Sequence, residues 1–297
     1  VFSDLNEKDR ISVSIYRGID DLIFDNLGLT ADWGNNTHSL SLRRVFNENL
    51  VGNFLVASSE FFTNFNLGGD DGLNSENKIL DQTLSANLTF FQSSDLEWRT
   101  GAQIKQLDFK YLNTFLEDTS FYIGENPIEA GFYTKLKWKG FSRFIIEPGL
   151  RYNYYSVYSS TPYIDLRLGA KYLLTDDRYI NIAFGNYHQF IQTVQDDYNP
   201  TILDSWLAVD NSIDPAEAQQ AVIGYEEYIR DIYKIQIEAY YKSIQNMLTF
   251  ENMRSSTDAE VSDEKVSDTF TPADGYAYGL EFFFQKTFGK LTRWVAY

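Results

Sequence analysis

Large apolar side chains recur at every second position along this chain, and that period restricts the possible folds more than any other feature. The last stretch shows it clearly, because Tyr278, Leu280, Phe282 and Phe284 alternate with neighbours that are mostly small or polar. A period of two is typical of a β-strand whose two faces meet different surroundings. Gly289 then marks a short connection to a further strand. The C-terminal stretch is therefore predicted to form a β-hairpin with one apolar face.

The same alternation recurs upstream and predicts an all-β chain of about 13 long strands. It is clear in residues 11–15, 40–43, 79–92, 96–105, 128–138, 144–154, 164–172 and 233–242. Predicted strands of about 12 to 15 residues exceed the usual soluble strand of about 5 to 6. They also exceed the roughly 9 to 11 residues that cross a bilayer at a tilt, as expected for strands that project beyond a membrane.

Short and long connections alternate along the chain, which favours an antiparallel up-and-down barrel over a Greek-key sandwich. The short turns are predicted at residues 47–49, 93–95, 139–140, 175–178, 230–231 and 287–289. The long polar segments are 66–78, 110–126, 193–215 and 251–274, and only the link 156–161 is short among them. In a barrel the short turns would be periplasmic and the long loops extracellular. Residues 17–36, which Gly18, Gly28 and Gly34 interrupt, are expected to be irregular or weakly stranded.

The composition excludes or disfavours several classes of function. A net charge of -17 argues against nucleic acid as a partner, because phosphates need a basic face. The chain has no cysteine and two histidines, which excludes disulfides and thiolate zinc sites and disfavours a multi-histidine metal site. No run of about 18 apolar residues is present, which excludes a transmembrane helix.

The polar faces of the predicted strands carry charges of both signs, as the lumen face of a large barrel does. The expected lumen charges are Glu97, Arg99, Lys105, Lys135, Lys137, Glu147, Arg151, Asp165, Arg167, Lys234 and Glu238. Aromatic residues near strand ends suit the headgroup level of a bilayer, and cross-strand pairing is the alternative explanation. This predicted girdle comprises Trp98, Trp138, Tyr152, Tyr154, Tyr155, Tyr240 and Tyr241.

No catalytic or metal constellation stands out, so we expect no enzyme activity and no cofactor. His188, beside Gln189 and Gln192, is the one candidate for a charge-relay set, and an ordinary lumen histidine is the preferred interpretation. Acidic loop residues offer oxygen ligands for calcium, but none has the spacing of a known loop motif. These are Asp70, Asp71, Asp196, Asp197, Asp258, Glu260, Asp263, Glu264 and Asp268.

The segment 193–215 is the best candidate for a ligand site. It combines aromatic rings with carboxylates, a pairing that suits a sugar or a metal chelate, whereas packing between loops is the alternative explanation. The candidate ligand-binding residues are Asp196, Asp197, Tyr198 and Trp206.

Five stretches, taken in order, resemble the barrel domain of TonB-dependent outer-membrane receptors. They are residues 33–62, 81–109, 145–174, 185–229 and the final hairpin, and the block 204–229 and the final hairpin are the most specific. The resemblance implies a transmembrane barrel in the outer membrane of a Gram-negative bacterium. It also implies uptake of a scarce ligand, such as an iron chelate, a vitamin or a glycan, with energy from the TonB complex. The implied partners are therefore outer-membrane lipid, the transported ligand and the TonB complex.

The chain departs from the family pattern in two ways. The family carries an N-terminal plug domain, which is not visible here, and its barrel has 22 strands. We therefore expect residues 1–297 to form a single partial barrel domain, an internal fragment whose missing plug region would contact the TonB complex. Two alternatives remain open from the sequence: a complete smaller barrel acting as a passive pore or adhesin, and a soluble β-sandwich that binds carbohydrate.

Overall fold

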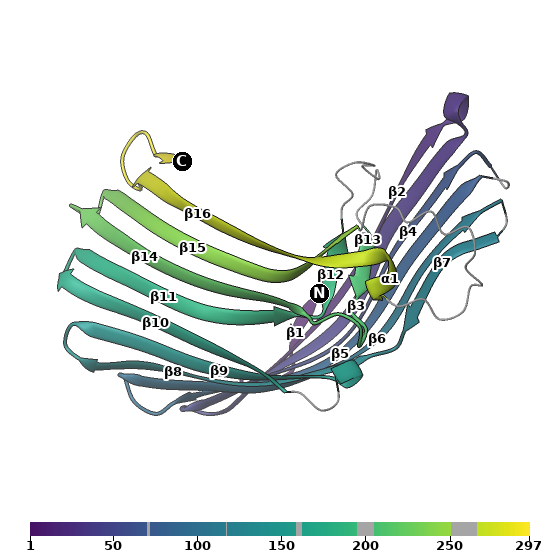
Figure 1. The fold of residues 1–297 in the computed structure, drawn as a ribbon. Coiled ribbons are helices and arrows are strands. Elements are labelled where there is room, and N and C mark those ends of the chain that lie inside the picture. Colours follow the sequence, from purple (N-terminus) through teal and green to yellow (C-terminus); the bar gives the residue numbers. More distant parts are fainter. Residues whose placement is uncertain (70–71, 117, 159–161, 195–204, 251–265) are drawn as a thin grey trace.

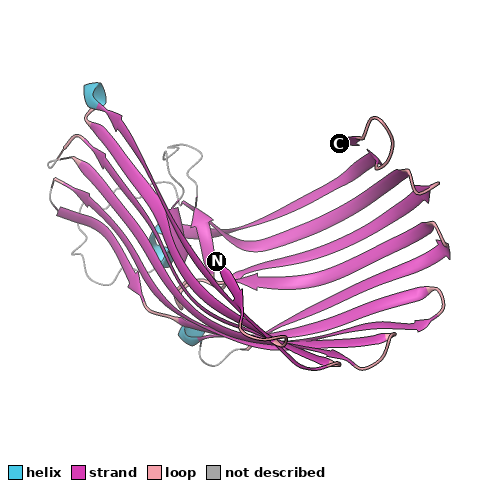
Figure 2. Ribbon diagram, turned by 180° about the vertical axis from the view of Figure 1, so that it is seen from behind, coloured by secondary structure: helices cyan, strands magenta, loops and turns pink. Residues whose placement is uncertain are grey.

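The computed structural model describes residues 1–69, 72–116, 118–158, 162–194, 205–250 and 266–297. These residues form one broad sheet that curves into an open trough, and no second sheet of comparable size covers either face (Figures 1 and 2). All strand pairings are antiparallel. The predicted open, incomplete barrel is confirmed, and the soluble sandwich is excluded.

The main sheet has 15 strands, which follow one another in sequence order. The one exception is β7, which pairs with the same strand β6 that also pairs with β8. Strands β12 and β13 form a separate small sheet. Twelve of the strands have 12 to 20 residues, close to the predicted number of long strands. The elements are β1 (Phe2–Asp4), β2 (Asp9–Phe24), β3 (Leu29–Asn47), β4 (Leu50–Leu67), β5 (Leu73–Phe91), β6 (Leu96–Phe115), β7 (Asp118–Glu125), β8 (Ile128–Phe141), β9 (Phe144–Tyr155), β10 (Tyr163–Thr175), β11 (Arg178–Gln189), β12 (Ile191–Val194), β13 (Ser205–Ala208), β14 (Ala216–Ile229), β15 (Tyr233–Phe250), α1 (Val266–Thr269), β16 (Phe270–Lys286) and β17 (Arg293–Ala296).

The alternation of the sequence places apolar side chains on the convex face of the trough. Val56, Leu84 and Ile104 occupy one row across β4, β5 and β6, because Val56 pairs with Leu84 and Leu84 with Ile104. Their side chains are 54–57% exposed, and Leu136 and Ile237 are also exposed. A soluble core would bury these residues, so the apolar face is directed outward rather than into a second layer.

The apolar band on the convex face has two distinct edges. Toward the long loops, one row of polar residues crosses β3 to β6, namely His38, Ser58, Gln82 and Gln106. Toward the short turns, Trp138, Phe141, Phe144 and Tyr172 form a chain of ring contacts, with centroids 4.6–6.4 Å apart. On β6 the band runs from Trp98 to Gln106, nine residues or about 26 Å of strand at about 3.3 Å per residue.

The rings of the predicted girdle divide between the two faces of the sheet. Trp98, Trp138, Tyr152 and Tyr241 are exposed on the convex face. Tyr155 is instead fully buried on the concave face, and Tyr240 lies on the concave face over Gly279. The alternation of side chains along each strand explains the concave position of Tyr155 and Tyr240, since both lie on the same side of their strands as charged lumen residues.

Three segments expected to be loops or irregular are paired strands. β2 and β3 pair as far as Phe24 and Leu29, β4 and β5 as far as Leu67 and Leu73, and β6 pairs with β7 over residues 109–125. These extensions lie beyond the apolar band, where both faces carry polar residues. The apolar alternation therefore fades there although the backbone ladder continues.

Most short turns lie where the alternation predicts them. The turn expected at residues 139–140 is an exception, because β8 continues to Phe141, which pairs with Phe144. A register shift between Trp138 and Phe141 breaks the alternation there, which explains the error. Within the described part of the chain, no helix has the length and apolar character needed to cross a membrane.

Candidate functional site

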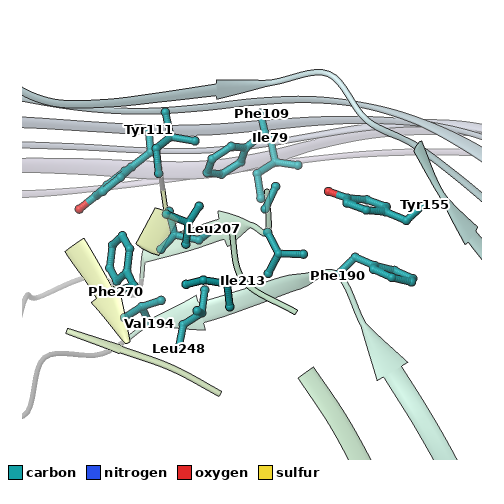
Figure 3. Packing of buried hydrophobic residues seen from close by; sticks show 14 residues of the cluster. Ile79, Phe109, Tyr111, Tyr155, Phe190, Val194, Leu207, Ile213, Leu248 and Phe270 are labelled. Atoms are coloured by element: carbon teal, nitrogen blue, oxygen red, sulfur yellow. The ribbon is translucent and has the colours of Figure 1, made fainter. Parts of the chain in front are cut away.

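Strands β12 and β13, which lie in sequence between β11 and β14, are placed inside the trough (Figure 1). The two strands pair with each other, from Ile191 opposite Ala208 to Val194 opposite Ser205. Their apolar side chains pack against the concave face of the main sheet, as Figure 3 shows. The buried cluster comprises Ile79, Phe109, Tyr111, Ile123, Tyr155, Phe190, Val194, Leu207, Ala208, Val209, Ile213, Leu248, Val266 and Phe270.

A buried amide attaches this inward hairpin to β5. The side chain of Asn77 is 1% exposed and bonds to both backbone groups of Trp206. Asn77 Nδ2 donates to the Trp206 carbonyl at 2.9 Å, and the Trp206 N–H donates to Asn77 Oδ1 at 3.0 Å. The amide thus takes the place of a neighbouring strand along the free edge of β13.

A second amide attaches the hairpin to the opposite wall. Gln192 on β12 donates to the carbonyl of Asn246 at 3.2 Å and accepts from the N–H of Leu248 at 3.0 Å. The β14–β15 ladder ends at Gln245, and the pairing of β15 with β16 shifts register between Ile244 and Met247, so Asn246 and Leu248 lie where the regular ladders end or are interrupted. The hairpin therefore spans the trough from β5 to β15 and is held at both ends.

Asp210, directly after β13, holds the return of the chain. Its carboxylate accepts from the N–H of Ser212 at 2.8 Å and from the N–H of Val266 at 2.9 Å. The Tyr158 hydroxyl donates to the carbonyls of Asp210 and Ile213. Burial, with Tyr163 and Asp210 nearby, raises the pKa of Tyr158, which keeps this donor protonated.

Beneath the hairpin lies a cavity of about 560 Å³, a size suited to a small ligand. One wall is the Trp206 ring, which meets Phe61 edge-to-face at 6.2 Å between centroids. The other lining residues come from six strands and the start of the hairpin: Asn35, Ser59, Ile79, Asp81, Lys105, Glu129, His188, Gln189, Phe190 and Ile191. Aromatic and aliphatic surface is thus combined with amides and carboxylates.

The charges of the cavity are only partly compensated. Lys105 lies 3.4 Å from Asp81, whereas Glu129 forms no ion pair with any residue that the structure describes. His188 contributes an imidazole whose Nδ1 lies 2.7 Å from Asp165 Oδ1. The cavity is therefore suited to neutral polar or cationic groups stacked against an aromatic wall.

His188 is not part of a hydrolytic triad. Its Nε2 lies 3.9 Å from a carboxylate oxygen of Glu217, so among the described residues the ring sits between two acids, without a nucleophile. Its inward position follows from Asn186, whose side-chain amide bonds to the backbone of β10 where the regular β10–β11 ladder ends. The preferred interpretation as an ordinary lumen histidine agrees with this geometry.

The candidate residues from the sequence have different outcomes. Trp206 lines the cavity, as described above. Asp196, Asp197 and Tyr198 lie outside the described residues, as do the acidic loop positions Asp70, Asp71, Asp258, Glu260, Asp263 and Glu264. No group of three or more potential metal ligands occurs among the residues that are described. Asn77, Gln192 and Asp210, which hold the hairpin, carried no recognisable signal in the sequence.

The charged residues expected in the lumen lie on the concave face, and most of them form ion pairs there. Glu147 bridges Lys135 at 2.5 Å and Lys137 at 3.3 Å. Glu226 likewise lies 3.4 Å from both Lys171 and Lys234. Because the lysines of these pairs remain partly exposed to solvent, the ion pairs contribute little to stability, and their consequence is a hydrated, charged inner surface.

Comparison with solved structures shows the same fold in a group of outer-membrane receptors and importers. The ferripyoverdine receptor of Pseudomonas aeruginosa is similar with a TM-score of 0.70 and 13% identity over 99% of this chain and 48% of that one. The ferric yersiniabactin uptake receptor of Yersinia pestis gives 0.66 and 11%, over 95% and 47%. The RagAB peptide transporter gives 0.61 and 8%, over 97% and 44%.

The chain thus spans about half the length of these structures. The curated proteins gave no match. The sequence model of the family described as "TonB dependent receptor-like, beta-barrel" matches residues 4–297. That match extends over nearly the whole sequence and agrees with the curved antiparallel sheet. The chain therefore belongs to the TonB-dependent receptor-like β-barrel family.

Proposed function

We propose that this chain forms part of the barrel wall of a TonB-dependent importer in the outer membrane of a Gram-negative bacterium. The observation that carries the proposal is the inversion of the sheet, with an apolar convex face and a charged concave face. In a soluble protein the exposed convex band would be costly, whereas hydrocarbon is its natural surrounding. The ion pairs of the concave face suit a water-filled lumen.

The dimensions of the convex band support placement in a bilayer. The nine residues from Trp98 to Gln106 match the 9–11 that a tilted strand needs to cross the hydrocarbon. The aromatic chain at the short-turn edge suits the headgroup level. Short turns would then face the periplasm and the long connections the exterior, where β2 to β7 project beyond the lipid.

Binding of a scarce ligand is proposed at the loop end, in the cavity beneath the inward hairpin. Trp206 and Phe61 would supply aromatic surface, while Glu129 and Asp81 would supply polar contacts. Asp196, Asp197 and Tyr198 lie between β12 and β13 in the sequence and remain part of the proposed site. Iron chelates, vitamins and glycans are the ligand classes considered, and the RagAB neighbour adds peptides.

Energy would come from the TonB complex, acting through a plug region elsewhere in the full-length protein. Residues 1–297 would then serve as a single partial barrel domain of that protein. The two siderophore receptors among the neighbours support import over passive diffusion.

The proposal is tested by uptake assays on the full-length receptor with labelled ferric siderophores, cobalamin, oligosaccharides and peptides. Trp206→Ala, and separately Asp197→Ala, should lower uptake of the cognate ligand at unchanged surface abundance. Trp33→Ala, at a tryptophan outside the cavity, serves as the matched control. Uptake that continues unchanged in both variants would refute this ligand site, and uptake that persists without TonB would refute active import.

A further inference from the structure

A second hollow lies in the concave floor between β8 and β11, with a volume of about 390 Å³. Small residues form its floor, namely Gly149, Gly169 and Ala183. The side chains around it are Tyr133, Lys135, Glu147, Arg151, Arg167 and Tyr187. We call this hollow the basic recess.

The basic recess lies deeper in the trough than the cavity beneath the hairpin. Glu129 lines that cavity and Lys135 lines the recess, six residues further along β8 toward the short turn. Six residues of strand correspond to about 20 Å. A solute entering at the loop end would therefore meet the cavity first and the recess second.

The recess is positively charged within a strongly acidic chain. Its lining holds three cations and one carboxylate, while the whole chain carries a net charge of -17. The carboxylate, Glu147, is shared between Lys135 and the neighbouring Lys137. The charges of the two arginines are thus left without a dedicated counterion in the lining.

Among the described residues, one carboxylate outside the lining lies within ion-pair distance of the two arginines. Arg167 forms a long ion pair of 3.8 Å with Asp165, and it shares that carboxylate with His188 and Asn153. Arg151 donates to the amide oxygen of Asn153 at 2.5 Å and forms no ion pair within the described part of the chain. Two guanidinium groups therefore retain unused donors above the recess.

Both guanidinium groups are held in position by their surroundings. Arg151 lies over Gly131, where an added Cβ would be 2.5 Å from its terminal nitrogen. Arg167 stacks on the ring of Tyr187 at 4.7 Å from the centroid. Guanidinium groups fixed in this way are suited to carboxylates, whose two oxygens match the planar fork of N–H donors.

We propose that the basic recess is a binding site for the carboxylate groups of a solute moving along the trough. Arg151 and Arg167 donate to the carboxylate, Lys135 adds to the positive potential, and the glycine floor leaves room for the solute. This inference rests on the proposed transport function for the presence of a solute in the trough. The charge of the recess does not depend on that function.

Cysteine labelling in the full-length receptor, embedded in outer-membrane vesicles, tests the proposal. The chain has no native cysteine, so a single introduced thiol reports one position. Gly169→Cys places the thiol in the recess floor, since a Cβ there has its nearest neighbour at 3.6 Å. Ser85→Cys, on the concave side of β5, is the matched control outside the recess. Anionic, cationic and neutral methanethiosulfonate reagents are compared at both positions.

The Gly169→Cys thiol should react about fivefold faster with the anionic than with the cationic reagent. This ratio follows from the screened Coulomb interaction between the unit charge of the reagent and two net positive charges at about 7 Å. Adding Arg151→Gln and Arg167→Gln should reduce this preference to about one. Succinate should slow labelling by the neutral reagent about twofold once its concentration reaches its dissociation constant. Succinamide, its uncharged counterpart, should give no protection.

Equal protection by succinate and succinamide, or a preference that survives both arginine substitutions, would overturn the proposal. A thiol that reacts with none of the reagents would also overturn it, because protein would then cover the recess. Uptake is measured in parallel on the receptor without cysteine. Succinate protection without TonB-dependent uptake would refute the transport function and leave the anion site standing, whereas uptake without protection would refute only the site.

Discussion

Replacing Asn77 by alanine should release the inward hairpin from the wall of the trough. The Asn77 amide is 1% exposed and bonds at 2.9 and 3.0 Å to the carbonyl and N–H of Trp206. In Asn77→Ala both backbone groups lose their partner inside a buried contact. A buried polar group left unpaired costs about 1–3 kcal/mol. Docking of the hairpin should therefore weaken by about 2–4 kcal/mol. This is less than the sum of the two upper values, because water can enter the space left by the Asn77 side chain.

Hydrogen exchange on the full-length receptor measures this loss directly. At 1.4 kcal/mol per factor of ten, amides in residues 205–213 should exchange about 30- to 700-fold faster in Asn77→Ala. Amides of the β4–β5 ladder should exchange as before, because their backbone partners are unchanged. Asn53→Ala is the matched control, since Asn53 is exposed and forms no side-chain hydrogen bond with the described residues.

Unchanged exchange in residues 205–213 of Asn77→Ala would refute the assignment of Asn77 as the attachment point. Faster exchange across the whole sheet would also refute it, because the substitution would then act on the fold in general.

Two further predictions concern the convex face and the loop end. Ile104→Arg should destabilise the membrane-inserted receptor by about 2–4 kcal/mol, while Gln103→Arg on the concave face should be tolerated, as urea titration of vesicle-folded protein would reveal. Burial, together with Asp210, raises the pKa of the Glu125 carboxyl. The protonated carboxyl therefore favours hairpin docking below the ordinary carboxyl pKa, and this contribution is lost as the pH rises through the raised pKa. Glu125→Gln should therefore slow hydrogen exchange of the hairpin at pH 7.5 and leave it unchanged at pH 4; slower exchange at both values would contradict this.

The sequence predicted those strands whose two faces meet different surroundings. Residues 79–92 alternate throughout, and both their class and their orientation follow from that pattern, as the exposed Leu84 shows. The pattern fails beyond the apolar band, where polar residues occur on both faces although the concave face also buries Tyr111 and Ile123. Residues 110–126 carry polar groups on both sides, so they resemble a loop although they pair as β6 and β7.

The candidate site was less accessible to sequence reasoning. Trp206 attracted notice because an aromatic ring among carboxylates is unusual, and it does line a cavity. Asn77 and Gln192 stand in ordinary polar stretches, and their roles arise from backbone groups 129 and 54 positions away in sequence. Contacts of that range depend on how the sheet curves, which no local pattern encodes.

The inversion of the sheet is tested most directly by spin labels placed at successive residues of β5 in the membrane-embedded, full-length receptor. Labels at Leu84 and Ala86 should be relaxed mainly by oxygen, which concentrates in lipid. Labels at Thr83 and Ser85 should be relaxed mainly by a water-soluble nickel chelate. An alternating preference with a period of two is the predicted result. Equal accessibility at all four positions, or the opposite assignment of the two sets, would contradict a sheet whose apolar face meets lipid.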